Sequence, residues 1–408
     1  MNFLRAIPIH SNTRLAFYGD QGTIPAIISL ARQFERPSLL MTSIPLDPSQ
    51  LALADQHYTI QGIADLSLLQ EQLPAGITLL AIPPTSDSER QQEASSKLIP
   101  AVRKLADHHQ VPLLLEVAAQ SAAVTDHIDT ILQVAGTSLI EVIKNERSGK
   151  MASPPSAISA NKHRPNHILL YCQESALVNT IEAHTLYCQV KNSYDSLILA
   201  DLSASPEHQV IAAYRRLAAV ILAGGGSQRL GQPKQLLDWF GQPFVRAVAQ
   251  TAIDACCDPV IVVTGHQGQQ VQHALDGLPV QITQNSDWQA GQSTSVKTGL
   301  AAVPQKNGAA LFMMVDQPQI PLSLLQALQQ MHASDLPHIV APMVEGQRAN
   351  PVLFDRSTFA DLAQISGDSG GRQLFSKYPI QWLPWPDNTI LLDVDTLEDY
   401  QQLIAACR

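Results

Sequence analysis

The sequence predicts an α/β protein built from two domains, residues 1–209 and 210–408. Short apolar runs alternate along the chain with segments whose apolar residues recur at helical spacing, which is typical of parallel sheets covered by helices. The length of 408 residues is enough for two or three domains. A polar stretch, Ser203–Gln209 (SASPEHQ), is the last break before the most prominent strand-like run, and we place the main boundary there.

Composition and charge exclude several functional classes. Hydrophobic residues make up 45% of the chain and charged residues 15%, as in globular proteins with substantial cores. The net charge of −10 argues against a broad nucleic-acid-binding surface, so an anionic ligand has to be held by local cations. The chain shows no apolar stretch of membrane-spanning length and no signal-peptide pattern. We therefore expect a cytoplasmic protein without a nucleic-acid or membrane partner.

The N-terminal half is predicted to form a parallel sheet that opens with a βαβ unit. Residues 15–18 are the first expected strand, 24–34 a helix and 38–42 the next strand. Further elements follow in the same alternation, with strands expected at 77–82, 111–116 and 130–134 and a long helix at 89–108.

The end of this half is less regular. The segment from about 144 to 166 is rich in Ser, Pro, Asn, Lys and Arg and has the composition of a linker. The apolar runs 167–172 and 196–201 are predicted strands, which either complete the N-terminal sheet or form a small bridging unit.

The C-terminal half is predicted to form a second sheet of the same kind. Strands are expected at 217–222, 259–264, 309–315 and 390–393, with 340–347 and 350–354 as a strand and a loop between the last two. Helices are expected at 241–255, 294–303 and 321–332, followed by a last helix after Thr396.

A glycine-rich turn follows the first strand of this half and is the strongest sequence indication of a ligand-binding site. Gly224, Gly225 and Gly226 leave backbone N–H groups uncovered, so such a turn is able to wrap a phosphate closely. Arg229 and Lys234 add two cations. The string matches neither the GxxxxGK[ST] nor the GxGxxG pattern. The structural alternative is a glycine-rich turn with two solvated basic residues.

Two further segments are expected at the same edge of the sheet. Thr264 and Gly265 end a β-branched strand, at the place where α/β sheets bind ligands, although a plain turn explains them equally well. Ser293 and Ser295 lie at the start of a helix, where hydroxyl and free N–H groups suit a nucleotide. Simple N-capping is the alternative for these two serines.

Two acids are candidate metal ligands. Asp316 follows the most apolar strand of the chain, where a carboxylate is costly unless it is paired or bound to a metal. The alternative is that Asp316 caps the helix at 321–332. Thr396 and the acids after it are explained as the start of the last helix, but this does not explain Asp393. Asp393 is therefore the second candidate ligand, and Asp395 could take that role instead. Carboxylates that face a phosphate favour Mg²⁺.

The glycine-rich string resembles the signature of the nucleotidyltransferases that activate the molybdenum cofactor. Their opening motif has the form LAxGxSxRMGxxK, and it stands here as Leu222, Ala223, Gly224, Gly225, Gly226, Ser227, Arg229, Leu230, Gly231 and Lys234. The resemblance implies a Rossmann-like, mixed and mostly parallel sheet of the nucleotide-diphospho-sugar transferase type. It also implies a triphosphate held by the glycine turn, Arg229 and Lys234, and a Mg²⁺ ion held by Asp316 and Asp393.

Later motifs extend the resemblance to the C-terminus. A GxxxSxxxG-like segment matches Gly291 to Gly299, with Ser293 and Ser295 at the nucleoside end. The pterin substrate side is represented by Asn350 and Pro351, and by a GDxGAR-like loop with Asp368 and Arg372. A flexible surface loop is the alternative for both of these segments.

The implied reaction is transfer of CMP from CTP to the terminal phosphate of molybdopterin-bound molybdenum, with release of pyrophosphate. The NPV, GDSGGR and DVDT strings resemble the cytidylyltransferase branch, whereas the LAGG opening is closer to the guanylyltransferase branch and to GTP. The alternatives are a transferase for sugar phosphates or other small phosphates, and a non-catalytic maturation factor for a molybdenum hydroxylase.

The N-terminal half resembles the accessory proteins found with selenium-dependent molybdenum hydroxylases. Those proteins carry a GxGGKTT phosphate loop, but here Thr23 stands in place of the lysine and Ile24 and Pro25 replace the hydroxyl residues. Glu116 keeps only the first acid of their second motif. The resemblance therefore implies a degenerate P-loop-like α/β domain that has lost nucleotide hydrolysis and retains either a docking role toward a molybdenum hydroxylase or a cofactor-handling role.

Overall fold

The structure is a computed structural model of the chain. It describes residues 14–19, 27–28, 30–34, 37–42, 46, 48–59, 63–70, 73–81, 88–111, 113–116, 130–135, 167–171, 180–191, 196–201, 204, 209–226, 230–368 and 370–407. The chain divides into two compact units, Met1–Ala213 and Tyr214–Arg408.

The N-terminal sheet has nine strands in the order β3-β4-β2-β5-β1-β6-β7-β8-β9, and its last strand continues past the unit boundary to Arg215. Every pair from β3 to β8 is parallel, as the alternation of strands and helices predicts. The strands are β1 (Arg14–Gly19), β2 (Ser38–Thr42), β3 (Gln56–Thr59), β4 (Ile77–Ala81), β5 (Leu113–Glu116), β6 (Thr130–Ala135), β7 (His167–Tyr171), β8 (Ser196–Ala200) and β9 (Val210–Arg215). The helices are α3 (Pro48–Leu51), η1 (Ile63–Leu69), α4 (Ser88–His109) and α7 (Thr180–Val190).

The predicted α/β class is therefore confirmed for this unit, and the apolar runs 167–172 and 196–201 join its sheet as β7 and β8. Residues 27–28 and 30–31 of the expected first helix are helical. Thr23, Ile24, Pro25 and the linker-like segment at 144–166 lie outside the described residues, so the degenerate phosphate loop stays a prediction.

The second unit is a mixed, mostly parallel sheet with the order β14-β13-β10-β15-β18-β16-β17, and β19 pairs with β16. The strands are β10 (Leu217–Ala223), β13 (Val260–Thr264), β14 (Val280–Gln284), β15 (Ala309–Met314), β16 (Ile339–Val344), β17 (Gln347–Arg348), β18 (Val352–Asp355) and β19 (Ile380–Pro384). Strand β18 is antiparallel to β15 and to β16, which makes the sheet mixed as expected. A two-stranded ribbon, β11 (Asp238–Trp239) and β12 (Gln242–Pro243), lies apart from this sheet.

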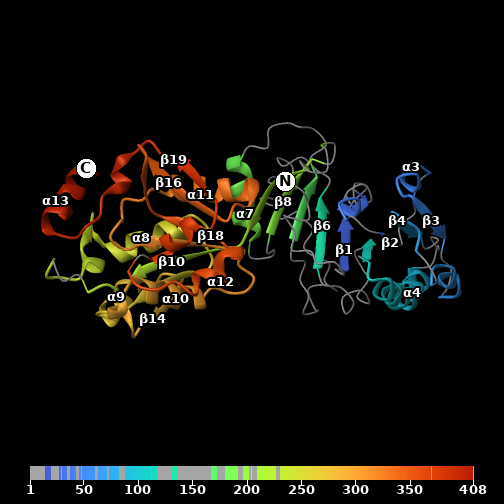
Figure 1. The fold of residues 1–408 in the computed structure, drawn as a ribbon, viewed down its shortest axis with the longest axis horizontal. Helices are drawn as coiled ribbons and strands as arrows, with labels where there is room; N and C mark the ends of the chain where they lie inside the picture. Colours follow the sequence, from blue (N-terminus) through green and yellow to red (C-terminus); the bar gives the residue numbers. More distant parts are fainter. Residues whose placement is uncertain are drawn as a thin grey trace. The chain divides into compact units, whose positions relative to one another are not determined.

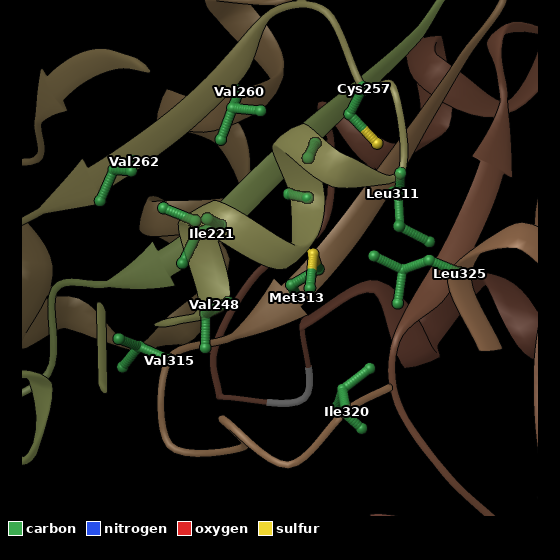
Figure 2. Close-up of a cluster of buried hydrophobic side chains, with 14 of the residues drawn as sticks. Ile221, Val248, Cys257, Val260, Val262, Leu311, Met313, Val315, Ile320 and Leu325 are labelled. Carbon is green, nitrogen blue, oxygen red and sulfur yellow. The ribbon is translucent and has the colours of Figure 1, made fainter. Parts of the chain in front are cut away.

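Helices cover both faces of this sheet (Figure 1). They are α8 (Phe244–Asp254), α9 (Gly268–Ala274), α10 (Gln292–Ala301), α11 (Leu322–Asp335), α12 (Phe359–Leu362) and α13 (Leu397–Ala406), with 3-10 turns η4 (Lys234–Leu236), η5 (Trp288–Ala290), η6 (Arg356–Thr358), η7 (Gly370–Ser376) and η8 (Asn388–Leu391). Ile221 of β10 faces one core together with Val248 of α8 and Leu325 of α11 (Figure 2). The next side chains along β10, Val220 and Leu222, face a second core against α10. Burial on both faces explains why β10 is apolar throughout.

Helix α10 packs directly on the sheet because of one glycine. A Cβ atom on Gly299 would lie 2.3 Å from Val220 Cγ1 and 2.9 Å from Val263 Cγ2, so only glycine fits at this position. Strands β10, β13 and β15 are parallel, and their carboxyl ends therefore meet at one edge of the sheet, beside the N-terminus of α10.

Three local predictions were wrong. Residues 390–393 do not form a strand, because η8 occupies Asn388–Leu391. The expected loop at 350–354 contains strand β18, which pairs with β15. The expected strand at 340–347 is interrupted by a turn at Glu345 and Gly346, both with positive φ, which joins β16 to β17.

Candidate active site

The glycine turn begins where β10 ends and is enclosed by three neighbouring segments. A Cβ atom on Gly224 would lie 3.1 Å from Ser295 Oγ, and one on Gly226 would lie 3.0 Å from Trp288 Cζ3. A Cβ atom on Gly265 would lie 2.6 Å from the carbonyl oxygen of Gly224. The structure thus brings the glycine turn, the end of β13 and the start of α10 together, and the backbone contact at Gly265 leaves no room there for a Cβ atom.

The carbonyl groups of this turn are held by specific donors. The buried side chain of Gln235 donates from Nε2 to the carbonyl oxygens of Ala223 and Gly225, both at 2.8 Å. The backbone N–H of His266 donates to the carbonyl of Gly224 at 3.2 Å. Gln235 was not among the predicted site residues, although its place directly after Lys234 is a signal that could have identified it. The neighbouring Ser227 and Arg229 lie outside the described residues.

The serines of α10 do not cap it. The N-cap residue is Gly291, which makes no side-chain cap bond. The Oδ1 atom of Asp368 accepts from Gln292 N at 3.3 Å, and the carbonyl of Gly367 accepts from Ser293 N at 3.1 Å. Ser293 and Ser295 are both buried, and Asn285 Nδ2 donates to Ser295 Oγ at 3.0 Å. Simple N-capping by these serines is therefore excluded, and Asp368 lies at the start of α10.

Thr264 is also buried, at the end of β13. Its hydroxyl donates to the carbonyl of Thr283 at 3.5 Å. The residue after Gly265, His266, is exposed and makes an edge contact with the ring of Trp288, with 5.4 Å between centroids. An aromatic pair therefore borders the glycine turn on this side.

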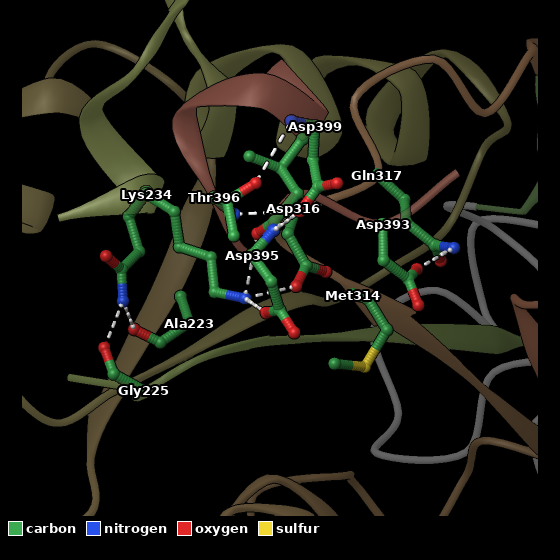
Figure 3. Close-up of polar contacts among 12 residues, drawn as sticks. Ala223, Gly225, Lys234, Met314, Asp316, Gln317, Asp393, Asp395, Thr396 and Asp399 are labelled. Carbon is green, nitrogen blue, oxygen red and sulfur yellow. Dashed lines mark hydrogen bonds and ion pairs between the residues drawn. The ribbon is translucent and has the colours of Figure 1, made fainter. Parts of the chain in front are cut away.

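A lysine and two acids form the charged centre of the site (Figure 3). Lys234 Nζ lies 2.6 Å from Asp316 Oδ2 and 3.0 Å from Asp395 Oδ1, and it donates to the carbonyl of Val394 at 3.1 Å. Burial by itself lowers the pKa of Lys234, but the charges and hydrogen bonds of Asp316 and Asp395 outweigh it and hold this pKa above its ordinary value. Lys234 therefore stays an ammonium. The helix that follows Asp316, α11, begins at Leu322 with Pro321 as its N-cap residue, so Asp316 is not a capping residue.

Asp393 is the third acid of the cluster and has different partners. Its Oδ1 atom accepts from Gln317 Nε2 at 2.7 Å. Loss of hydration raises the pKa of the Asp393 carboxyl, and repulsion from Asp316 and Asp395 raises it further, against the opposing charges of Lys234 and Arg372. Two carboxylates that repel each other across a pocket are a donor set that a bound cation would stabilise.

A pocket of about 650 Å³, part of it open to solvent, joins these residues to the predicted substrate side. Asp316, Asp393, Asn350 and Arg372 line it together, as does Leu222 from the end of β10. Its apolar wall consists of Phe312, Met314, Val352, Phe354 and Phe375, among others. Pro351 and Asp368 do not line this pocket. The site thus has a charged end and an aromatic end.

The described residues contain no cluster of three or more His, Cys, Asp or Glu side chains placed to hold a metal ion. Over the same part of the chain, none of the helices has the length and apolar character needed to cross a membrane.

We expect Asp393→Asn to stabilise the metal-free protein. Because the folded-state pKa of Asp393 is raised, its ionisation opposes folding at every pH above that pKa. The melting temperature in EDTA at pH 7 should rise by about 1–2 °C. The gain should shrink as the pH falls through the raised pKa and vanish below 3.8, the ordinary value, where the carboxyl is neutral in both states.

Asp399→Asn is the matched control, because the expected sign is opposite. Hydrogen bonds from Thr396 and Asp395 lower the pKa of the Asp399 carboxyl, so its ionised form stabilises the fold above the ordinary pKa. This variant should melt earlier than the parent at pH 7. Equal shifts in melting temperature for the two variants would contradict the claim that the ionised Asp393 carboxylate destabilises the fold.

Comparisons with known proteins identify the family of the C-terminal unit. The family model that matches is described as a MobA-like NTP transferase domain and covers residues 219–381. Nicotine blue oxidoreductase from Paenarthrobacter nicotinovorans is 30% identical over 198 residues, which are 46% of this chain and 96% of that relative. The molybdenum cofactor cytidylyltransferase of Escherichia coli K12 is 23% identical over 182 residues, which are 44% of this chain and 92% of that protein.

Two further proteins are similar to the C-terminal half of this chain. A probable molybdenum cofactor guanylyltransferase of Bacillus cytotoxicus is 23% identical over 47% of this chain and 97% of that protein. A solved structure of Rv0371c from Mycobacterium tuberculosis H37Rv, described as a complex with manganese, is 28% identical over 47% of this chain and 99% of that one, with a TM-score of 0.40. The matched family model lies wholly within Tyr214–Arg408. The C-terminal unit of this chain therefore belongs to the MobA-like NTP transferase family.

Proposed function

We propose that the C-terminal unit is a molybdenum cofactor cytidylyltransferase. It transfers CMP from CTP to the terminal phosphate of molybdopterin-bound molybdenum and releases pyrophosphate. The observation that carries the proposal is the charged centre of Lys234 and Asp316, which lies next to both the glycine turn and the pocket lined by Asp393 and Arg372. Family membership and the relatives named as molybdenum cofactor transferases support it.

The chemistry needs positioning and charge stabilisation rather than a covalent nucleophile. A phosphate oxygen of the acceptor attacks the α-phosphorus of the nucleotide, the bond to the β-phosphate oxygen breaks, and pyrophosphate leaves on the opposite side. In this proposal the glycine turn, Lys234 and Arg229 bind the triphosphate, and Ser293, Ser295, Thr264 and Gly265 surround the nucleoside.

The carboxylates fit a divalent cation, and we propose that Asp316 and Asp393 hold Mg²⁺. The ion supplies charge neutralisation to the triphosphate when it is bound. Asp393 suits this role better than Asp395, because Asp393 lines the pocket together with Asp316 and Asp395 does not line it.

The acceptor is assigned to the aromatic end of the pocket. Phe312, Phe354 and Phe375 offer flat apolar surfaces, which suit a planar ring such as a pterin better than a sugar. Asn350 and Arg372, at the same pocket, offer hydrogen bonds and a positive charge to the acceptor phosphate.

The test is to incubate the full chain with molybdopterin-bound molybdenum, Mg²⁺ and each of CTP, GTP, ATP and UTP in turn, and to measure pyrophosphate. We expect release with CTP and at least tenfold less with the purine nucleotides. A preference for GTP would assign the chain to the guanylyltransferase branch. Release with a sugar phosphate but not with the molybdenum cofactor would contradict the proposed acceptor.

For the N-terminal unit we propose docking to a molybdenum hydroxylase without nucleotide hydrolysis. The substitution of Thr23 for the phosphate-loop lysine supports the loss of hydrolysis. Full-length protein should therefore show no ATP hydrolysis in the absence of an acceptor.

A further inference from the structure

The amide of Gln235 is buried, and it donates hydrogen bonds to the glycine turn and to the residue just before it. Gln235 is 1% exposed, and its Nε2 atom lies 2.8 Å from two carbonyl oxygens, those of Ala223 and Gly225. Contacts of this length with two acceptors require the nitrogen, and not the oxygen, to face them. Its Oε1 atom is buried and has no hydrogen-bond partner among the described residues. An unpaired buried acceptor is costly, so the benefit of this side chain lies in its two donated bonds.

Those two bonds determine where the turn directs its N–H groups. A trans peptide unit is planar, and its C=O and the following N–H point in opposite directions. Because the carbonyls of Ala223 and Gly225 converge on one nitrogen, the N–H groups of Gly224 and Gly226 point away from Gln235. The carbonyl of Gly224 between them is held by the N–H of His266. Three consecutive peptide units of the turn are thereby fixed.

Gln235 is also linked to the charged centre through the backbone. Gln235 follows Lys234 on η4. Figure 3 shows the Lys234 ammonium next to Asp316 and Asp395, whereas Ala223 and Gly225 lie on the other side of η4. The short 3-10 turn η4 therefore positions both the N–H groups of the glycine turn and the Lys234 ammonium.

We propose that Gln235 is a positioning residue for the nucleotide phosphates, a role that rests on the proposed function. Its amide keeps the Gly224 and Gly226 N–H groups directed at the triphosphate, in the correct register with Lys234. Preorganised N–H groups bind phosphate at a low entropic cost, whereas a turn that rotates freely has to be ordered by the ligand.

The test compares Gln235→Leu with Gln329→Leu. Gln329 is also buried and donates to a backbone carbonyl, that of Ala255, at 2.8 Å, but it lies on α11 outside the site. The probe is inorganic tripolyphosphate, whose binding is measured by calorimetry, and KM and kcat for CTP are measured alongside. We expect Gln235→Leu to weaken tripolyphosphate binding roughly 10- to 100-fold and to raise KM more than it lowers kcat. Gln329→Leu should leave both unchanged at a similar melting temperature.

A second variant keeps the proposal falsifiable if Gln235→Leu folds poorly. Gln235→Met keeps the length and flexibility of the side chain but has no donor, so it should fold where Gln235→Leu does not and should weaken binding by a similar factor. Equal affinities in the parent and Gln235→Leu, or equal losses in Gln235→Leu and Gln329→Leu, would overturn the proposal, as would a parent that does not bind tripolyphosphate. The proposed function alone would be contradicted if the parent protein binds tripolyphosphate, Gln235→Leu weakens that binding, and no pyrophosphate is released from any nucleotide.

Discussion

Asp316→Ala is expected to lower kcat for pyrophosphate release roughly 100- to 1,000-fold, because the carboxylate proposed to hold the divalent cation against the triphosphate is lost. The fold should survive. Lys234 keeps its bonds to Asp395 and to the Val394 carbonyl, so no charge is left isolated. We expect a stability loss of about 1–2 kcal/mol, measured by urea unfolding alongside steady-state kinetics.

Asp355→Asn is the control for this variant. Asp355 is as buried as Asp316, but its Oδ2 atom lies 3.0 Å from His332 Nε2 and not in the pocket. This change should reduce stability without a specific loss of kcat. Turnover near the parent level in Asp316→Ala would overturn the metal assignment.

Lys234→Met is expected to reduce kcat/KM about 1,000-fold and to destabilise the fold more than Asp316→Ala does. The two variants differ because the ion pair is asymmetric. Lys234 is the only hydrogen-bond donor that the described part of the chain offers to the Asp316 carboxylate, which is 10% exposed. Its loss leaves a nearly buried charge uncompensated, at a cost of about 3 kcal/mol.

The double variant Lys234→Met/Asp316→Asn separates the two effects. Stability should recover, because the unpaired charge is gone, whereas activity should not. Lys234→Arg keeps the charge but not the compact ammonium, and we expect it to be impaired in activity and close to the parent in stability. If Lys234→Met were no less stable than Asp316→Ala, the proposed role of Lys234 in neutralising Asp316 would be wrong.

The central strands were predictable because burial leaves a strong local pattern. Strands β10, β13 and β15 are buried on both faces and consist of continuous apolar runs. Strands β14 and β19 were missed because they lie farther from the centre of the sheet and are only partly buried, with polar residues such as Gln281 and Gln381 inside them. Their partners β13 and β16 stabilise them through long-range pairing that a local pattern does not contain.

The predicted strand at 390–393 shows the opposite error. Its apolar residues suggest a buried strand, but the Asp387 side chain accepts from Thr389 N and starts a 3-10 turn there. Gln319 Nε2 then donates to the carbonyls of Thr389 and Leu392, which takes the place of pairing with a strand. A side chain 70 residues away in sequence thus decides the local structure.

Within the site, the charged residues were predictable and the positioning residues were not. A carboxylate at the end of a buried strand, such as Asp316, is unusual enough to be noticed in the sequence. The roles of Gln235 and Asp368 depend on which backbone groups face them, and this is set only by the folded chain. Sequence reasoning therefore identified the chemistry but not the groups that hold it in place.

Because Gly299 has no side chain, the packing beneath α10 has a consequence for how nucleotide preference can change in this domain. Because α10 rests on Val220 and Val263 without an intervening methyl group, the height of the helix above the sheet depends on side-chain volume in the interior. That height also sets the gap between Ser295 and Gly224, which we assign to the nucleoside end. Changes in nucleotide preference during evolution can therefore arise from volume changes beneath the helix, at positions that no ligand atom touches.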